Sequence, residues 1–224
     1  MTVIEPQRRD INSHHIKKNS ASLRLWHWLN TLVITGSLLT VLLNSTVLKS
    51  RNNATLIQSQ LNQAGATVTN DQARSAAHAI SDKIWTVHIY FGYTLAALLL
   101  FRLILEFFQL ADQKLMRKIK DAYNHYFVLK KQRETARHEF WVKTLYAIFY
   151  LMLLVMVLTG LCLAFEDDVP LLKSMHWIRE IHSFTMYLIL AFITVHLAGV
   201  FLAERKDSPG IVSDMINGGK HEKQ

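Results

Sequence analysis

Four long stretches of the sequence carry almost no charge, and they restrict the possible folds more than any other feature. They are residues 25–48, 84–108, 141–165 and roughly 177–203. Each reaches the roughly 20 apolar residues that an α-helix needs to cross a hydrocarbon layer about 30 Å thick. The chain is therefore expected to be all-α, a bundle of four transmembrane helices with spans at about 22–48, 84–108, 141–165 and 177–203.

A water-soluble all-α bundle is the alternative fold. The helices of a soluble bundle carry a polar stripe that faces water. The stretches LWHWLNTLVITGSLLTVLL and VKTLYAIFYLMLLVMVLTGLCLAF have no such stripe and are apolar around the whole helix. The pattern favours the membrane protein.

The distribution of Lys and Arg predicts the orientation of the spans. The N-terminal segment, the 109–140 connection and the C-terminal tail carry 17 basic residues, whereas the other side carries six, matched by six acids. The positive-inside rule then places both termini in the cytoplasm. The net charge of +8 is thus expected to face anionic lipid, and its spread over three loops argues against a nucleic-acid partner.

One membrane domain is expected over residues 21–206, between a flexible cytoplasmic tail at 1–20 and a second tail at 207–224. Within the 49–83 loop, Gly65 separates two helical stretches, and Thr69 with the two residues after it can cap the second, which continues into the second span. The 109–140 connection alternates basic and apolar residues at helical spacing. It predicts a helix on the cytoplasmic membrane surface, with a solvated linker as the alternative.

Cysteine usage limits how a cofactor can be attached. Cys162 is the only cysteine and lies within the third span, and the motif C-x-x-C-H is absent. A disulfide framework, a cysteine metal site and a covalently attached haem are therefore excluded.

Four of the eleven histidines lie inside the predicted spans: His27, His88, His182 and His196. Ionisable side chains are costly within a bilayer, so each is a functional candidate. The first span runs outward, and the second and fourth run inward. His88 and His182 therefore share an outer level, and His27 and His196 share an inner one. His182 and His196 lie on one face of their helix, about 21 Å apart along its axis.

Each level brings two imidazoles from different helices together, which is what six-coordinate haem iron needs on its two faces. A lone histidine in a span would more often be a hydrogen-bonded core residue. Four histidines at matching depths are harder to explain by that structural role. Zinc or copper is a further alternative. A closed zinc site uses about four ligands around one point, and each level offers only two. The sequence thus predicts an outer haem iron bound by His88 and His182 and an inner one bound by His27 and His196.

Four more residues are candidates for contact with haem. Gly92 follows His88 by one turn and Gly199 follows His196, and a missing side chain lets a flat ring approach the backbone; ordinary helix packing is the alternative. Arg102 shares the face of His88 but lies at the inner level, where it is expected to pair with a haem propionate. Arg24 is a second propionate candidate at the cytoplasmic edge, with snorkelling toward water as the alternative.

Several stretches together resemble the bacterial cytochrome b561 and Ni,Fe-hydrogenase b-type cytochrome family. They are RLWHWLN, WTVHIYFGYTLAALLLFR, VLTG and IHSFTMYLILAFITVHLAGVFLAE followed by PGIVSDMINGG, and the resemblance covers about residues 20–220. It implies a bundle that holds two b haems, with ligands from the first, second and fourth spans. Those roles map onto the same four histidines.

The resemblance also implies electron transfer across the membrane between a redox partner and the quinone pool. The tail GIVSDMINGGK is most similar to hydrogenase and thiosulfate-reductase cytochrome subunits, in which an outer-face enzyme donates electrons and quinone is reduced near the inner haem. The 49–83 loop departs from a hydrogenase subunit, which leaves the outer-face partner open. Whether the chain is an enzyme itself or a subunit, and whether it forms a homodimer, also stays open.

Two other functions compete with this one. A standalone superoxide:quinone oxidoreductase would need a positively charged outer opening; the outer loops have no net charge, although Lys83, Arg74 and Arg179 can act locally. A haem-free transporter or proton channel would need a polar pathway. The third span offers only Thr144, Tyr146, Tyr150 and Thr159 for one.

Overall fold

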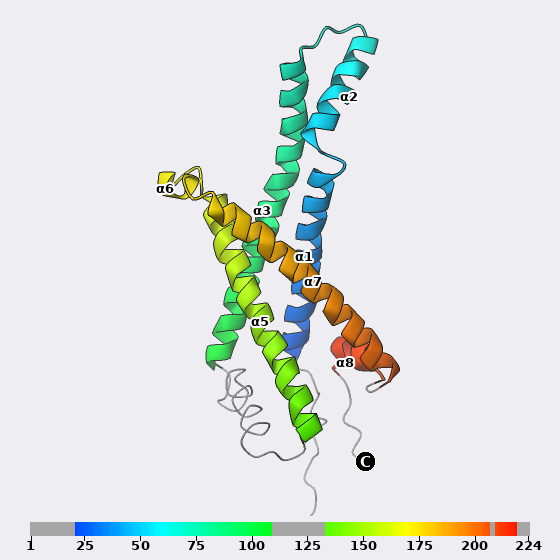
Figure 1. Cartoon of the computed structure of the whole chain (residues 1–224), viewed down its shortest axis with the longest axis vertical. Coiled ribbons are helices and arrows are strands. Elements are labelled where there is room, and N and C mark those ends of the chain that lie inside the picture. Colours follow the sequence, from blue (N-terminus) through cyan, green and yellow to red (C-terminus); the bar gives the residue numbers. More distant parts are fainter. Residues whose placement is uncertain (1–20, 109–132, 207–208, 219–224) are drawn as a thin grey trace, which may run out of the picture. The chain divides into compact units, whose positions relative to one another are not determined.

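The computed structural model describes residues 21–108, 133–206 and 209–218, with the backbone alone at 105–108 and 133–143. Its helices are α1 (Ala21–Ser45), α2 (Ser50–Gln63), α3 (Asn70–Phe108), α5 (Arg133–Ala164), α6 (Pro170–Lys173), α7 (Trp177–Arg205) and α8 (Ile211–Asn217) (Figure 1). No strand occurs in these ranges. The all-α prediction is confirmed.

Four of the helices are long and apolar enough to cross a membrane. They are α1, the Asn70–Ile104 part of α3, the Thr144–Ala164 part of α5, and α7. The prediction of four transmembrane helices is therefore confirmed. Of the helix predicted over 109–140, residues 109–132 lie outside the described residues, as do residues 1–20 of the predicted N-terminal tail.

The loop between the first two spans folds as the sequence predicts, into two helices. Gly65 takes a φ of 84°, a left-handed conformation that glycine adopts without strain, and it ends the turn after α2. Thr69 and Gln72 form a reciprocal cap on α3: the Gln72 N–H donates to Thr69 Oγ1 at 3.2 Å, and the Thr69 N–H donates to Gln72 Oε1 at 3.0 Å. From this cap α3 runs through 39 residues without a break.

Small side chains hold α2 against the first turns of α3 in a helical hairpin, hereafter the 50–83 hairpin (Figure 1). Its core is Ala54, Ala73 and Ala77, each at most 2 % exposed, with Ile57 and Val68 packed at the edges. Alanines let two helix backbones approach closely. The buried Ser81 hydroxyl extends this packing by donating to Asn44 Oδ1 of α1 at 3.2 Å.

Two compact units divide the chain. One combines the residues up to Trp28 with those from Thr194 onward, and the other is Leu29–Ile193. In the second unit, Phe149 of α5 stacks on Phe192 of α7 with ring centroids 4.7 Å apart. The domain boundaries expected from the sequence, a single domain over 21–206, stay a prediction.

Candidate functional site

His88 of α3 and His182 of α7 lie together in the Leu29–Ile193 unit. Their ring centroids are 6.4 Å apart and their planes meet at 80°. Both side chains are half-buried, although each sits in an apolar helix that is long enough to cross a membrane. The two rings that the sequence predicts for the outer level therefore lie next to each other in the structure.

Hydroxyl groups hold the Nδ1 atom of both rings. Thr40 Oγ1 and Ser37 Oγ of α1 lie 2.9 and 3.3 Å from His88 Nδ1. Thr159 Oγ1 of α5 lies 3.0 Å from His182 Nδ1. The Nε2 atom of each ring is the nitrogen left to bind a metal ion, and a hydrogen bond on the other ring nitrogen is the usual way in which proteins orient a ligating histidine.

His27 of α1 and His196 of α7 form the second pair, within the other unit. Their ring centroids are also 6.4 Å apart, and their planes meet at 57°. The Trp28 ring stands edge-on to His27 with a centroid distance of 5.3 Å. All four histidines predicted as ligands thus lie in pairs, and the members of each pair are the ones that the sequence predicts.

The spacing within each pair fits two axial ligands of one iron. Metal–imidazole bonds are about 2.0–2.1 Å long, and the ring centre lies about 1.1 Å behind the ligating nitrogen, so two rings on opposite sides of one ion have centres about 6.3 Å apart. Both pairs have a separation of 6.4 Å. Among the described residues, no three His, Cys, Asp or Glu side chains gather at one point. The donor sets therefore suit haem better than a closed zinc site.

The short helix α8 is tied to α1 and α7 next to the His27–His196 pair. The Arg24 guanidinium donates to the Ile216 carbonyl, and Trp28 Nε1 donates to the Met215 carbonyl at 3.2 Å. At the other end, Glu204 accepts the Gly210 and Val212 N–H groups at 2.8 and 3.2 Å. Both ends of α8 therefore have their free backbone groups satisfied by side chains, as helix ends require. This helix was not predicted from the sequence.

Replacing Glu204 by alanine is expected to loosen α8. Losing the acceptor of the first N–H groups lets the start of a helix open more often, typically by a factor of about 5. Hydrogen exchange of the 211–217 amides should accelerate by that factor. Glu180→Ala, at the other end of the same helix α7, is the control; equal acceleration in both variants would show that Glu204 does not hold α8.

The other predicted site residues have different surroundings. Arg102 donates from Nε to the Tyr150 hydroxyl at 3.0 Å and lies 5.8 Å from the centroid of that ring. A Cβ placed on Gly92 or Gly199 meets no atom within 4 Å, so both glycines border open space. The propionate roles of Arg102 and Arg24 and the haem contacts of the two glycines stay predictions.

Two other glycines, which were not predicted as site residues, make close contacts with rings instead. A Cβ on Gly160 of α5 would lie 3.1 Å from His182 Cε1. A Cβ on Gly36 of α1 would lie 2.5 Å from Phe91 Cζ of α3. Gly36 precedes Ser37, and Gly160 follows Thr159, so each small residue stands beside a hydroxyl that reaches a histidine.

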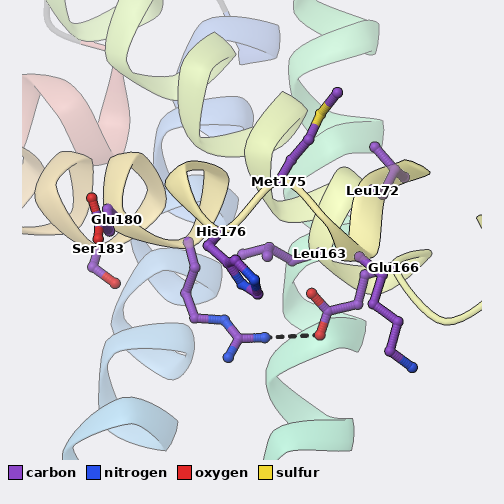
Figure 2. A pocket seen from close by; sticks show the side chains of 9 residues that line it. Leu163, Glu166, Leu172, Met175, His176, Glu180 and Ser183 are labelled. Atoms are coloured by element: carbon purple, nitrogen blue, oxygen red, sulfur yellow. Dashed lines mark hydrogen bonds and ion pairs between the residues drawn. The ribbon is translucent and has the colours of Figure 1, made fainter. Parts of the chain in front are cut away.

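A cavity of about 340 Å³ lies where α5 ends and α7 begins (Figure 2). Arg179 Nη2 is paired there with Glu166 Oε1 at 2.8 Å. The lining also includes Lys173, Glu180 and Ser183, the residue after His182. Its two carboxylates, Glu166 and Glu180, match its Lys and Arg side chains, Lys173 and Arg179, in number, so these four groups carry no surplus positive charge.

A family model described as prokaryotic cytochrome b561 matches residues 19–218. The chain belongs to this family. The match spans both histidine pairs and extends through α8, and it agrees with the extent of the resemblance inferred from the sequence. Comparison with curated proteins and with solved structures finds no match.

Membership of the cytochrome b561 family makes the chain a membrane protein of electron transfer, and it implies haem b as the cofactor. The coarse function expected from the sequence is thereby confirmed. The residues that fit this cofactor are the two histidine pairs, because the ring centroids of each pair have the separation expected of two axial ligands.

Proposed function

We propose that this family member is a di-haem cytochrome b that carries electrons across the bacterial inner membrane between a redox partner and the quinone pool. The observation that carries the proposal is the repeated geometry: two histidine pairs, each with ring centroids 6.4 Å apart. A bound haem supplies one-electron chemistry through its iron. A pair on each side of the membrane supports passage of electrons from one face to the other.

The protein's own residues would hold and tune the two sites. His88 and His182 provide the ligands of an outer site, oriented by Thr40 and Thr159. His27 and His196 provide those of an inner site, with Arg24 and Arg102 as candidate partners for propionates. With two histidines at each iron no coordination position is left for oxygen, which favours electron transfer over chemistry at the metal.

The orientation and the partners are part of this proposal. Both termini lie in the cytoplasm, as the distribution of basic residues indicates. Electrons enter from an outer-face redox enzyme or electron-transfer protein, and quinone reacts near the inner site, as in hydrogenase or thiosulfate-reductase cytochrome b subunits. The 50–83 hairpin projects on the outer side, where such a partner would meet the chain.

The superoxide:quinone oxidoreductase alternative loses support from the outer cavity. That reaction needs positive charge to attract an anion, and Arg179 was a candidate for it. Its guanidinium is paired with Glu166, so its charge is locally balanced. No observation in the described residues favours a transporter, because Thr159, one of the few polar groups of the third span, contacts His182 instead of lining a polar path.

A dithionite-reduced minus oxidised absorption spectrum of the purified protein, with extracted haem counted per chain, tests the proposal. Two low-spin b haems per chain are expected, since all four histidines are then ligands. One haem would show that one pair is assigned wrongly. Protein without haem, after expression with ample haem supply, would overturn the proposal.

A further inference from the structure

The hydroxyl protons of Thr40 and Thr159 are committed to backbone carbonyls. Thr40 Oγ1 donates to the Ser37 carbonyl at 2.6 Å. Thr159 Oγ1 donates to the Val155 carbonyl at 2.7 Å and lies 3.2 Å from the Met156 carbonyl. A threonine hydroxyl has one proton and two lone pairs. Toward its histidine, each oxygen therefore acts as an acceptor.

This accepting role fixes which nitrogen of each imidazole carries the proton. Since Thr40 Oγ1 accepts at 2.9 Å, His88 Nδ1 must be the N–H donor, and the same holds for His182 Nδ1 and Thr159 at 3.0 Å. A neutral imidazole has one N–H and one lone pair. The lone pair then resides on Nε2 of both rings, which is the form that binds a metal ion.

We infer that Thr40 and Thr159 are positioning residues that lock His88 and His182 as Nε2 ligands and lower the midpoint potential of the haem they share. This inference rests on the proposed function. A hydrogen bond from Nδ1–H to an acceptor makes the imidazole a stronger electron donor through Nε2. Stronger donation stabilises the ferric state, so the iron becomes harder to reduce.

The two threonines act from two different helices, α1 and α5, whereas the ligands come from α3 and α7. All four predicted spans therefore contribute to the His88–His182 site: two supply rings and two supply the hydroxyls that orient them. Two hydroxyls lie near His88 Nδ1, since Ser37 Oγ is 3.3 Å away in addition to Thr40. At His182 the described residues place one hydroxyl, that of Thr159, together with a backbone partner at Met156.

Substitution by valine removes each hydroxyl and keeps the shape of the side chain. Redox titration of the full-length protein, followed by absorption, should resolve two components, and the one missing from His182→Ala belongs to this site. Thr159→Val should raise the potential of that component and leave the other unchanged. Thr40→Val should raise it by less, because Ser37 remains. Thr159→Ser should restore the original value.

Thr94→Val is the matched control. The Thr94 hydroxyl lies on α3 with His88, and its hydrogen bond within the described part of the chain goes to its own helix, at the Tyr90 carbonyl 2.9 Å away. The inference is overturned if the midpoint potential of this component is unchanged in both Thr40→Val and Thr159→Val, or if Thr94→Val shifts it equally. In either case, two haems per chain would leave the proposed function standing. Thr159→Val could also lose this haem altogether. In that case, a Thr159→Ser protein that keeps the haem supports the inference, and a Thr159→Ser protein that loses the haem overturns the inference. Absence of any component that depends on His182 would sink the proposed function as well.

Discussion

The His182→Ala protein should retain one haem per chain instead of two. His182 faces His88 with the spacing of two axial ligands, and the remaining histidine alone cannot hold a six-coordinate iron. The His27–His196 pair lies in the other compact unit, so its haem should stay bound. The measurement is extracted haem per chain together with the reduced-minus-oxidised spectrum, which should lose about half of its amplitude.

His176→Ala is the control for this experiment. His176 lies six residues before His182 and lines the cavity at the start of α7, where its side chain is exposed. Its removal should leave both haems in place. Two haems in the His182→Ala protein would mean that the pairing of His88 with His182 is wrong, whatever the fate of the other pair.

A side chain at Gly36 is expected to separate α1 from α3. Even a single Cβ there would lie 2.5 Å from Cζ and 2.8 Å from Cε1 of Phe91, well inside van der Waals contact. Gly36→Val should therefore cost about 1–3 kcal/mol of stability, as overpacking does. Because Ser37 and Thr40 reach His88 from the same stretch of α1, the haem of that site should be weakened or lost. Thermal melting and haem content in detergent measure the two effects.

Making room at Phe91 should reverse the damage. In the double variant Gly36→Val with Phe91→Ala, the new side chain occupies the space of the ring, and both haem content and melting temperature should recover relative to Gly36→Val alone. Ala97→Val, which also creates a valine but at an exposed position of α3, should change neither. Unaltered haem content in Gly36→Val would show that close approach of α1 and α3 is not required.

Much of the architecture could be predicted because it depends on local pattern. Length and apolarity identify a membrane helix whatever its neighbours are. Thr69 was readable as the cap of α3 because capping is local, although its partner in the structure, Gln72, was not among the residues predicted for the cap. The histidine pairs followed from depth alone, because alternating helix direction converts residue number into height in the membrane.

The partners of the histidines could not be predicted in the same way. Depth does not reveal how each helix is rotated about its axis, so Thr40 and Thr159 were indistinguishable from ordinary polar residues of a span. Because the rotation of each helix was unknown, Gly92 and Gly199 were selected only by their nearness to histidines in the sequence. The glycines that touch a ring, Gly36 and Gly160, lie on other helices.

Helix α8 was missed for a different reason. It has seven residues, too few to show helical periodicity, and its ends are held by residues far away in sequence, such as Arg24 and Trp28. The signal that could have revealed it is the GIVSDMINGG stretch itself: a glycine at each end with a positive φ, Gly210 and Gly218, brackets the helix.

Because α3 is unbroken, the number of residues between two positions determines whether their side chains lie on the same side of the helix. The helix turns about 100° per residue, so the eleven residues from Ala77 to His88 add up to three turns plus about 20°. Ala77, which α2 covers, and His88, which Thr40 of α1 contacts, therefore share one side of α3. Inserting one residue between Ala79 and Lys83 would turn the 50–83 hairpin by about 100° around this axis, whereas four residues would turn it by only about 40°. The count of residues along α3 thus determines the direction in which the hairpin faces relative to the histidine beneath it.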